Sequence, residues 1–187
     1  SDLLADGLST LREELGVCPQ HDILFRKLTT LEHLLFFAQL KGRAPAPALA
    51  EAEHYLRLFH LEHRADHLGH ELSGGMRRKL STAIALCGGS RFVTLDEPTA
   101  GMDPVARREL WTLLKTVRAG RTVLLTTHYM DEADVLGDRV AIMAKGRLRC
   151  VGSTAFLKNH FGAGYSLHLK LAASLFSATA EGATVVL

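Results

Sequence analysis

The chain has 187 residues, of which 47% are hydrophobic and 22% are charged, so it is long enough for one globular domain with a core and too apolar to be disordered. Its 22 basic and 20 acidic residues are spread along the sequence and give a net charge of +2, which supports neither nucleic-acid binding nor binding to a membrane surface. No apolar run reaches the roughly 18 to 20 residues that cross a bilayer. The cysteines Cys18, Cys87 and Cys150 lack metal-ligand partners and indicate free thiols in a reducing compartment.

The first part of the chain predicts a strand followed by helices. Residues 17–18 look like a strand that runs into a loop at Pro19, and Gln20 begins that loop. Thr29 and Glu32 form a capping box before a mostly buried helix over residues 31–41. A turn over residues 43–47 then leads to a second helix from Pro47 to about Leu61. We therefore expect a helical subdomain inserted into an α/β protein.

Four histidines follow this second helix at three- and four-residue spacing: His60, His63, His67 and His70. That spacing could bring pairs of imidazoles together on one face of a helix, as in a metal site. No cysteine or other fixed ligand joins them, so a solvated polar face is the competing interpretation, and it is the one we favour.

Leu72-Ser73-Gly74-Gly75-Met76 opens a long helix over residues 76–87, which Gly88 and Gly89 end. A serine and two glycines before a helix allow close backbone approach at the positive end of the helix dipole, which suits an anion site. An ordinary N-cap explains the same residues, so this segment alone does not decide between the two.

Residues 92–95 predict a strand buried on both faces, and it ends in two adjacent carboxylates, Asp96 and Glu97. Ligands collect at the carboxyl ends of strands in open α/β sheets. Neighbouring side chains on a strand point in opposite directions, so one acid could hold a metal while the other faces an attacking water. A solvated strand end without function is the alternative.

Asp103 and Pro104 predict the start of a helix that continues to Val117. A strand over residues 121–127 then delivers the imidazole of His128 to the same end of the sheet. The elements expected after it are a helix at 130–136, a strand at 139–144, a hairpin turn at 145–146, a strand at 148–151, a helix at 155–160 and an alternating strand at 165–171.

Taken together, these motifs resemble the nucleotide-binding domain of an ABC transporter. Gln20 resembles the Q-loop glutamine, residues 72–76 the signature motif, residues 91–97 the Walker B strand with its glutamate, residues 101–103 the D-loop, and His128 the switch histidine. The strings at 18–22 and 127–134, and Met76 in the signature, are similar to the A subfamily of lipid transporters. Residues 152–165 look like the segment that leaves the first of the two nucleotide-binding domains there.

The resemblance implies a P-loop NTPase-like α/β fold with a mostly parallel sheet and an inserted helical subdomain. We expect a partial nucleotide-binding domain at 1–165, with its helical subdomain at about 27–88 and the catalytic remainder at about 89–150, and a C-terminal regulatory extension that starts at 166–187. ATP and Mg²⁺ are the implied cofactors. The protein would hydrolyse ATP at the cytoplasmic face of a membrane as part of an integral membrane transporter.

The resemblance also assigns roles to residues. Asp96 and Gln20 would hold Mg²⁺, Glu97 would act as general base, and His128 and Gln20 would contact the nucleotide or the attacking water. The cofactor-binding set is Ser73, Gly74, Gly75, Asp103, Gln20 and His128. Ser73 to Gly75 would act in trans on ATP held by a second nucleotide-binding domain. The transmembrane domains would contact residues 31–40 and move a lipid, while nucleic acid is not an expected partner.

One family motif is missing: no Gly-x-x-x-x-Gly-Lys-Ser/Thr occurs in the 187 residues. In the family that phosphate loop precedes the glutamine, so we interpret the chain as a fragment that is inactive by itself, and we expect the strand beside residues 91–96 to be missing as well. Two other classes remain. A soluble ABC-type ATPase of DNA repair or ribosomes would carry a coiled-coil insertion or basic arms, and a non-catalytic regulatory domain would lack Glu97 or His128.

Overall fold

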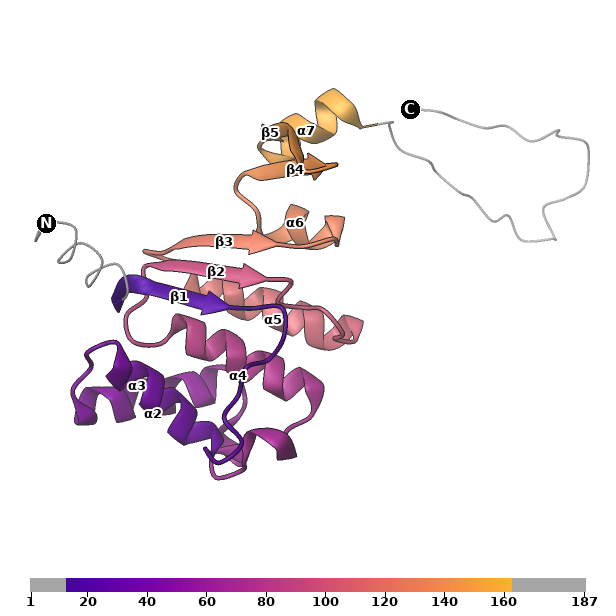
Figure 1. Cartoon of the computed structure of the whole chain (residues 1–187). Helices are drawn as coiled ribbons and strands as arrows, with labels where there is room; N and C mark the ends of the chain where they lie inside the picture. Colours follow the sequence, from indigo (N-terminus) through magenta and orange to yellow (C-terminus); the bar gives the residue numbers. More distant parts are fainter. Residues whose placement is uncertain (1–12, 163–187) are drawn as a thin grey trace, which may run out of the picture. The chain divides into compact units, whose positions relative to one another are not determined.

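The computed structural model describes residues 13–162, and the chain divides into two compact units, Ser1–Leu136 and Gly137–Leu187. The first unit contains a parallel sheet in the order β1 (Leu15–Cys18), β2 (Phe92–Asp96) and β3 (Thr122–Thr126) (Figure 1). β2 is the central strand, with Thr94 opposite Val17 on one side and Leu124 on the other. The expectation that the strand beside residues 91–96 would be missing is therefore wrong, since β2 has a partner on both sides.

The two faces of this sheet differ in burial. On β2 the side chains of Val93 and Leu95 are 1% exposed, whereas Phe92 is 46% exposed. Helix α4 (Gly74–Leu86) packs against β1 and β2, and α5 (Pro104–Val117) lies on the same side of the sheet (Figure 1). The prediction of a strand buried on both faces is wrong because, within the described residues, helices cover only one face.

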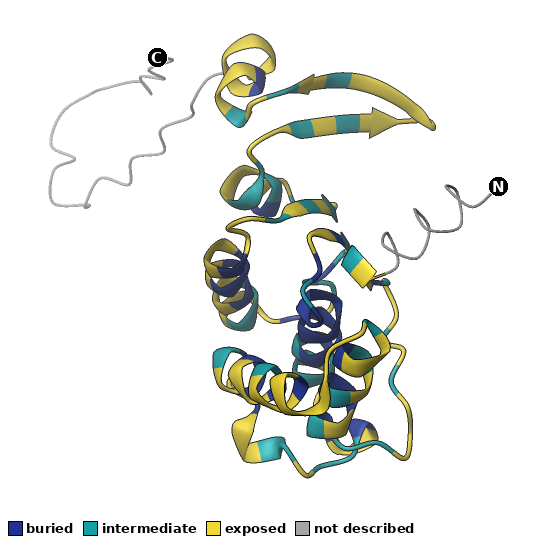
Figure 2. Cartoon of the chain, turned by 90° about the vertical axis from the view of Figure 1, so that its left-hand side faces the viewer, coloured by how far each residue is buried: buried dark blue, intermediate teal, exposed yellow. Residues whose placement is uncertain are grey.

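A close backbone contact joins β1 to α4. A Cβ atom added at Gly16 would lie 1.8 Å from the carbonyl oxygen of Ala85, which is far inside van der Waals contact. Gly16 therefore lets the strand approach the backbone of the helix. Ala85 and its neighbours in α4 belong to the longest buried stretch within residues 13–162, and buried residues gather where the helices face one another (Figure 2).

The inserted helical segment begins as predicted and then departs from the prediction. Helix α2 (Thr30–Leu40) has the expected capping box, in which Thr29 Oγ1 accepts from Glu32 N at 3.2 Å and Glu32 Oε2 accepts from Thr29 N at 2.8 Å. Helix α3 spans Pro45–Leu58, so it starts within the predicted turn and ends before Leu61. Both prolines fit its first turn because the N–H groups there have no partner within the helix.

The four histidines do not form a ligand cluster. Short 3-10 helices, Glu62–Arg64 (η1) and Gly69–Glu71 (η2), occupy this segment. His67 Nε2 is 2.9 Å from Arg64 Nη1, and the other three histidines are exposed. No group of three or more His, Cys, Asp or Glu side chains within residues 13–162 is arranged to hold a metal ion.

The remaining helices of the first unit lie close to their predicted positions. Helix α4 begins at Gly74, two residues earlier than expected, with Ser73 as its N-cap. Helix α5 and helix α6 (Met130–Leu136) have the predicted bounds. No helix in the described part of the chain is both long and apolar enough to span a membrane.

The second unit contains an antiparallel hairpin of β4 (Val140–Ala144) and β5 (Arg147–Gly152), followed by α7 (Thr154–Phe161). Lys145 and Gly146 have φ values of 54° and 68°, as a two-residue hairpin turn requires, so this turn is confirmed. The strand expected at 165–171 and the extension expected at 166–187 lie outside the described residues.

Candidate active site

The carboxyl ends of the three parallel strands bring together residues that are far apart in sequence. The loop after β1 carries Gln20, β2 ends at Asp96 and leads to Glu97, and β3 leads to His128. Parallel strands end on the same side of a sheet, so their following residues meet there. Four of the predicted site residues are thus neighbours.

Glu97 is the centre of this group. Its Oε2 accepts a hydrogen bond from Gln20 Nε2 at 3.2 Å, and its Oε1 lies 3.0 Å from His128 Nδ1, which donates to it. The Glu97 side chain is 26% exposed and the His128 side chain is 57% exposed. The carboxylate is therefore oriented from two sides and still reached by solvent, as a group that acts on a water must be.

The backbone of Glu97 adopts a conformation that few side chains favour. Its φ is 47°, in the left-handed region, which is uncommon for a residue other than glycine. The Glu97 N–H donates to the carbonyl of Thr126 at 3.0 Å, so β3 supports this residue just beyond the end of the regular strand pairing. Uncommon backbone conformations of this kind persist only where surrounding contacts enforce them.

Asp96 has a different set of contacts from Glu97. Thr126 Oγ1 donates to Asp96 Oδ1 and also accepts from Glu97 N at 3.2 Å. The two carboxylates therefore have separate partners, and one hydroxyl group touches both residues. Thr126 was not among the predicted site residues, although it is the register partner of Asp96 and correct alignment of the two strands would have found it.

Two further residues that were not predicted, Tyr129 and Arg107, lie beside His128. The Tyr129 ring lies 4.1 Å from the His128 ring, measured between centroids, and Arg107 Cζ lies 3.8 Å from the centroid of the Tyr129 ring. Arg107 belongs to α5, so a cation–π contact connects that helix to the segment after β3. The sequence gives no local sign of this contact because 22 residues separate the two side chains.

The signature residues lie at the N-terminus of α4. Ser73 Oγ accepts from Met76 N at 3.3 Å, and both Ser73 and Gly74 are exposed. A Cβ atom at Gly75 would lie 3.9 Å from the Met102 side chain, so this terminus adjoins the segment that precedes α5. Within residues 13–162, no hydrogen bond or ion pair joins Ser73, Gly74 or Gly75 to the group around Glu97.

Asp103 caps α5. Its Oδ1 accepts from Ala106 N at 3.0 Å and from Val105 N at 2.9 Å. These N–H groups, that of Ala106 first, lower the pKa of the Asp103 carboxyl below its usual value. A tight turn connects Asp103 to the acidic pair, with Ala100 N donating to the Glu97 carbonyl at 3.0 Å.

Comparison with known proteins decides the family. The family model described as "ABC transporter" matches residues 1–100, which is more than half of the chain. The chain belongs to the ABC transporter family. Two solved structures agree with this ABC fold. An ATP-binding subunit of an ABC transporter matches with a TM-score of 0.74 and 31% identity, over 85% of this chain and 67% of that one. A bacterial ABC transporter cassette in a dimeric structure matches with a TM-score of 0.71 and 26% identity, over 79% of this chain and 66% of that one.

The relatives of this ABC chain include members of the A subfamily. It is 53% identical over 166 residues to phospholipid-transporting ATPase ABCA3 of Mus musculus, and the matched region covers 89% of the chain and 10% of that protein. It is 54% identical over 162 residues to retinal-specific phospholipid-transporting ATPase ABCA4 of Mus musculus, or 87% of the chain and 7% of that protein. The chain thus spans a tenth or less of the length of these relatives, and the predicted resemblance to this subfamily is confirmed.

Proposed function

We propose that this chain is part of the nucleotide-binding domain of an ABC transporter, in which it binds and hydrolyses ATP to move a lipid across a membrane. The observation that carries the proposal is the Glu97 carboxylate, held between Gln20 and His128 with Asp96 beside it. Hydrolysis of a phosphoanhydride needs a positioned acceptor for a proton of the attacking water, together with groups that stabilise charge on the transferred phosphoryl. Glu97 supplies the proton acceptor, and the side chains of Gln20, Asp96 and His128 around it supply the groups that stabilise charge.

The residues divide these tasks as follows. Glu97 polarises the attacking water as general base, and Gln20 keeps the carboxylate oriented. His128 donates a hydrogen bond from Nδ1 to Glu97, and its other ring nitrogen contacts the γ-phosphate. Asp103 belongs to the segment between the acidic pair and α5, where it helps to form the nucleotide interface.

Mg²⁺ fits the donor set at Asp96. Mg²⁺ usually keeps several waters and takes one or two protein carboxylates together with substrate phosphates, which agrees with an exposed Asp96 and with the finding that residues 13–162 hold no cage of three or more ligands. Asp96 and the Gln20 amide are the groups that would hold the ion, partly through water. When bound, Mg²⁺ neutralises charge on the phosphates.

Ser73, Gly74 and Gly75 act on a second nucleotide-binding domain. The exposed N-terminus of α4 offers N–H groups and the positive end of the helix dipole to a phosphate. A related bacterial cassette was solved as a dimer, which supports the assignment of this terminus to ATP held by the partner domain.

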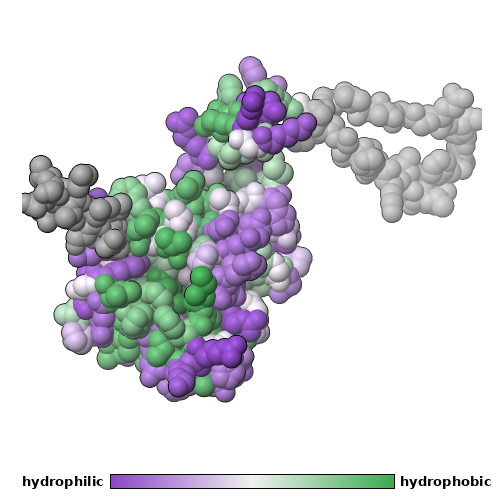
Figure 3. All heavy atoms as spheres, viewed as in Figure 1, coloured by the Kyte–Doolittle hydropathy of each residue, from purple (hydrophilic) through white to green (hydrophobic). Residues whose placement is uncertain are grey.

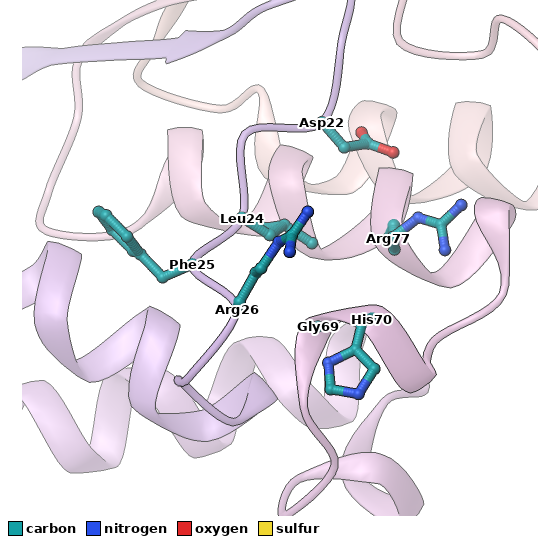
Figure 4. A pocket seen from close by; sticks show the side chains of 7 residues that line it. All are labelled: Asp22, Leu24, Phe25, Arg26, Gly69, His70 and Arg77. Atoms are coloured by element: carbon teal, nitrogen blue, oxygen red, sulfur yellow. The ribbon is translucent and has the colours of Figure 1, made fainter.

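The transmembrane partner binds beside the loop that follows β1. Apolar side chains are exposed there and on α2, with Ile23 72%, Phe36 44% and Leu40 68% accessible, and apolar surface covers this part of the molecule in Figure 3. A cavity of about 220 Å³ opens next to them (Figure 4). Its lining residues are Asp22, Leu24, Phe25, Arg26, Gly69, His70 and Arg77.

The proposed domain belongs on the cytoplasmic face of the membrane, because ATP is available there. A phospholipid is the proposed substrate because ABCA3 and ABCA4 are phospholipid-transporting ATPases.

Glu97→Gln in the full-length transporter tests the proposed function. The amide keeps the hydrogen-bonding shape but is a poor base, so we expect ATP binding to be retained and phosphate release to fall on the order of 10²-fold or more. Glu62→Gln, at an exposed acid on η1, is the matched control and should hydrolyse ATP like the wild type. Wild-type turnover in Glu97→Gln would assign the base to another residue, and a wild-type transporter without turnover would favour the regulatory class.

A further inference from the structure

Arg78 is a buried cation that the proposed chemistry does not use. It lies in α4, five residues after Ser73, and is 4% exposed. Its donors reach two segments that are far apart in sequence. Nε donates to the Pro98 carbonyl at 3.1 Å, and Nη1 donates to the carbonyls of Pro19 at 2.5 Å and Gln20 at 3.2 Å and to Asp22 Oδ1 at 3.4 Å. Nη2 donates to the carbonyls of Glu97 at 2.9 Å and Asp96.

Burial of a guanidinium is costly unless its donors are satisfied. Here all three nitrogens are engaged, mostly by backbone carbonyls just past the ends of β1 and β2, where strand pairing stops. Asp22 Oδ1 forms an ion pair with Arg78 Nη1 and also accepts from Ser81 Oγ at 3.1 Å. A rigid planar fork of five N–H groups suits such a set of fixed acceptors, whereas the single ammonium of lysine does not.

These contacts act on the geometry of the reactive groups. One side of the fork holds the backbone of Gln20, and the other holds the backbone of Glu97, whose φ of 47° needs enforcement from its surroundings. The side chains of the same two residues meet at 3.2 Å. A change in the spacing of the two backbones therefore changes how the Glu97 carboxylate is oriented.

We propose that Arg78 is the positioning residue for ATP hydrolysis, fixing the loop that carries Gln20 to the segment that carries Glu97. Arg78 does not touch the nucleotide and acts only through these two residues. The inference rests on the proposed function, because it presupposes that Glu97 is the general base.

The test is Arg78→Lys in the full-length transporter, with Arg57→Lys as the control for the same substitution. Arg57 lies in α3, its side chain is 62% exposed and its Nη1 is 3.9 Å from Glu53 Oε2, away from the acidic pair. Because misplacement of reactive groups by about 1 Å can cost 10²-fold in rate, we expect Arg78→Lys to lower kcat by roughly 10- to 100-fold. KM for ATP should change by less than about threefold, since the nucleotide contacts remain. Arg57→Lys should keep kcat within about twofold.

A double-mutant cycle with Gln20→Ala provides a readout that a general loss of stability would not give. If Arg78 acts through Gln20 and Glu97, the fold-loss in kcat of the double variant will be smaller than the product of the fold-losses of Arg78→Lys and Gln20→Ala. If Arg78→Lys is not recovered folded, Asp22→Asn takes its place, because it removes the carboxylate partner of the same guanidinium. It should also lower kcat without a change in KM, but by a smaller factor than expected for Arg78→Lys.

The inference is overturned by wild-type kcat in folded Arg78→Lys, by an equal loss in Arg57→Lys, or by multiplicative effects in the cycle. Where Asp22→Asn is the variant measured, an unchanged kcat overturns it. Its failure is distinguishable from failure of the proposed function. If Glu97→Gln abolishes turnover while Arg78→Lys does not affect it, only the role of Arg78 is wrong, whereas a wild-type transporter without turnover overturns both.

Discussion

At the residue scale, a single hydroxyl group links the two acids of the site. Thr126 Oγ1 donates to Asp96 and accepts from the backbone of Glu97. Hydrogen bonds to charged groups contribute about 1.5 to 3 kcal/mol. The hydroxyl therefore helps to determine both the direction of the Asp96 carboxylate and the position of Glu97, although neither bond involves the nucleotide.

Thr126→Val should lower kcat by about 10- to 100-fold, which corresponds to the loss of one such hydrogen bond. Thr126→Ser is the control, since it keeps the hydroxyl and loses only a methyl group, and it should stay within about threefold of the wild type. Steady-state phosphate release by the full-length transporter measures both. A loss in Thr126→Ser as large as that in Thr126→Val would contradict this role, because serine keeps the hydroxyl.

At the element scale, α2 is tied to the loop after β1 by His33. The buried His33 Nε2 accepts from Phe25 N at 2.9 Å, and Nδ1 is 2.7 Å from the Thr29 carbonyl, to which it donates. This arrangement needs the neutral imidazole, because a proton on Nε2 would remove the acceptor. Burial lowers the pKa of His33 below its usual 6.5, although the Thr29 carbonyl and Glu32 oppose the shift.

The sign of the resulting pH dependence follows from linkage. The folded pKa is below the unfolded one, so the unfolded chain binds the proton first as pH falls. The stability contributed by neutral His33 is fully present above pH 6.5 and is lost as pH falls from there toward the folded pKa. Between pH 8 and pH 5.5, the free energy of unfolding of a complete nucleotide-binding domain should thus fall more for the wild type than for His33→Gln. Denaturant titration measures this, and His63→Gln, at an exposed histidine, should behave like the wild type.

The N-terminus of α4 provides a second prediction at this scale. Ser73→Arg places a long cation where the partner's phosphate must approach, so we expect it to block ATP-dependent dimerisation of a complete domain without lowering the affinity of the monomer for ATP. Ser73→Ala loses the same N-cap, at a cost of about 1 kcal/mol in stability, but adds no bulk and should still dimerise. Size-exclusion chromatography with ATP, together with ATP titration, separates the variants. Loss of monomer affinity in Ser73→Arg would show that the site is used in cis.

The elements that local chemistry determines were predictable, and those that depend on distant contacts were not. The capping box of α2, the Asp103 cap of α5 and the turn at Lys145 and Gly146 are local, and each appears as predicted. The pairing of β2 with β1 joins residues 77 apart, such as Leu15 and Phe92, and no local pattern reports it. Arg78 was missed for the same reason: its six acceptors come from two segments, residues 19–22 and 96–98, that only the folded sheet brings to α4.

At the scale of the whole molecule, one face of the sheet carries exposed apolar side chains. Val17 on β1, Phe92 on β2 and Leu124 on β3 are 53%, 46% and 64% accessible, respectively. Contiguous apolar surface of this kind promotes association in water. The 187-residue chain should therefore aggregate at concentrations at which a longer chain that includes the phosphate loop stays monomeric, and light scattering during concentration of the two would show the difference. Equal solubility would mean that this face is protected within the 187 residues.

The same comparison tests whether these residues suffice for activity. The 187 residues carry Asp96, Glu97 and His128 but no Gly-x-x-x-x-Gly-Lys-Ser/Thr motif. If two charge-assisted hydrogen bonds to phosphate are absent, at about 1.5 to 3 kcal/mol each, affinity for ATP falls by about 10² to 10⁴. The chain by itself should therefore release no phosphate, whereas the longer chain should bind ATP tightly. Titration of both with a fluorescent ATP analogue and Mg²⁺ gives the answer, and micromolar binding with phosphate release by the 187-residue chain would place a complete phosphate site within it.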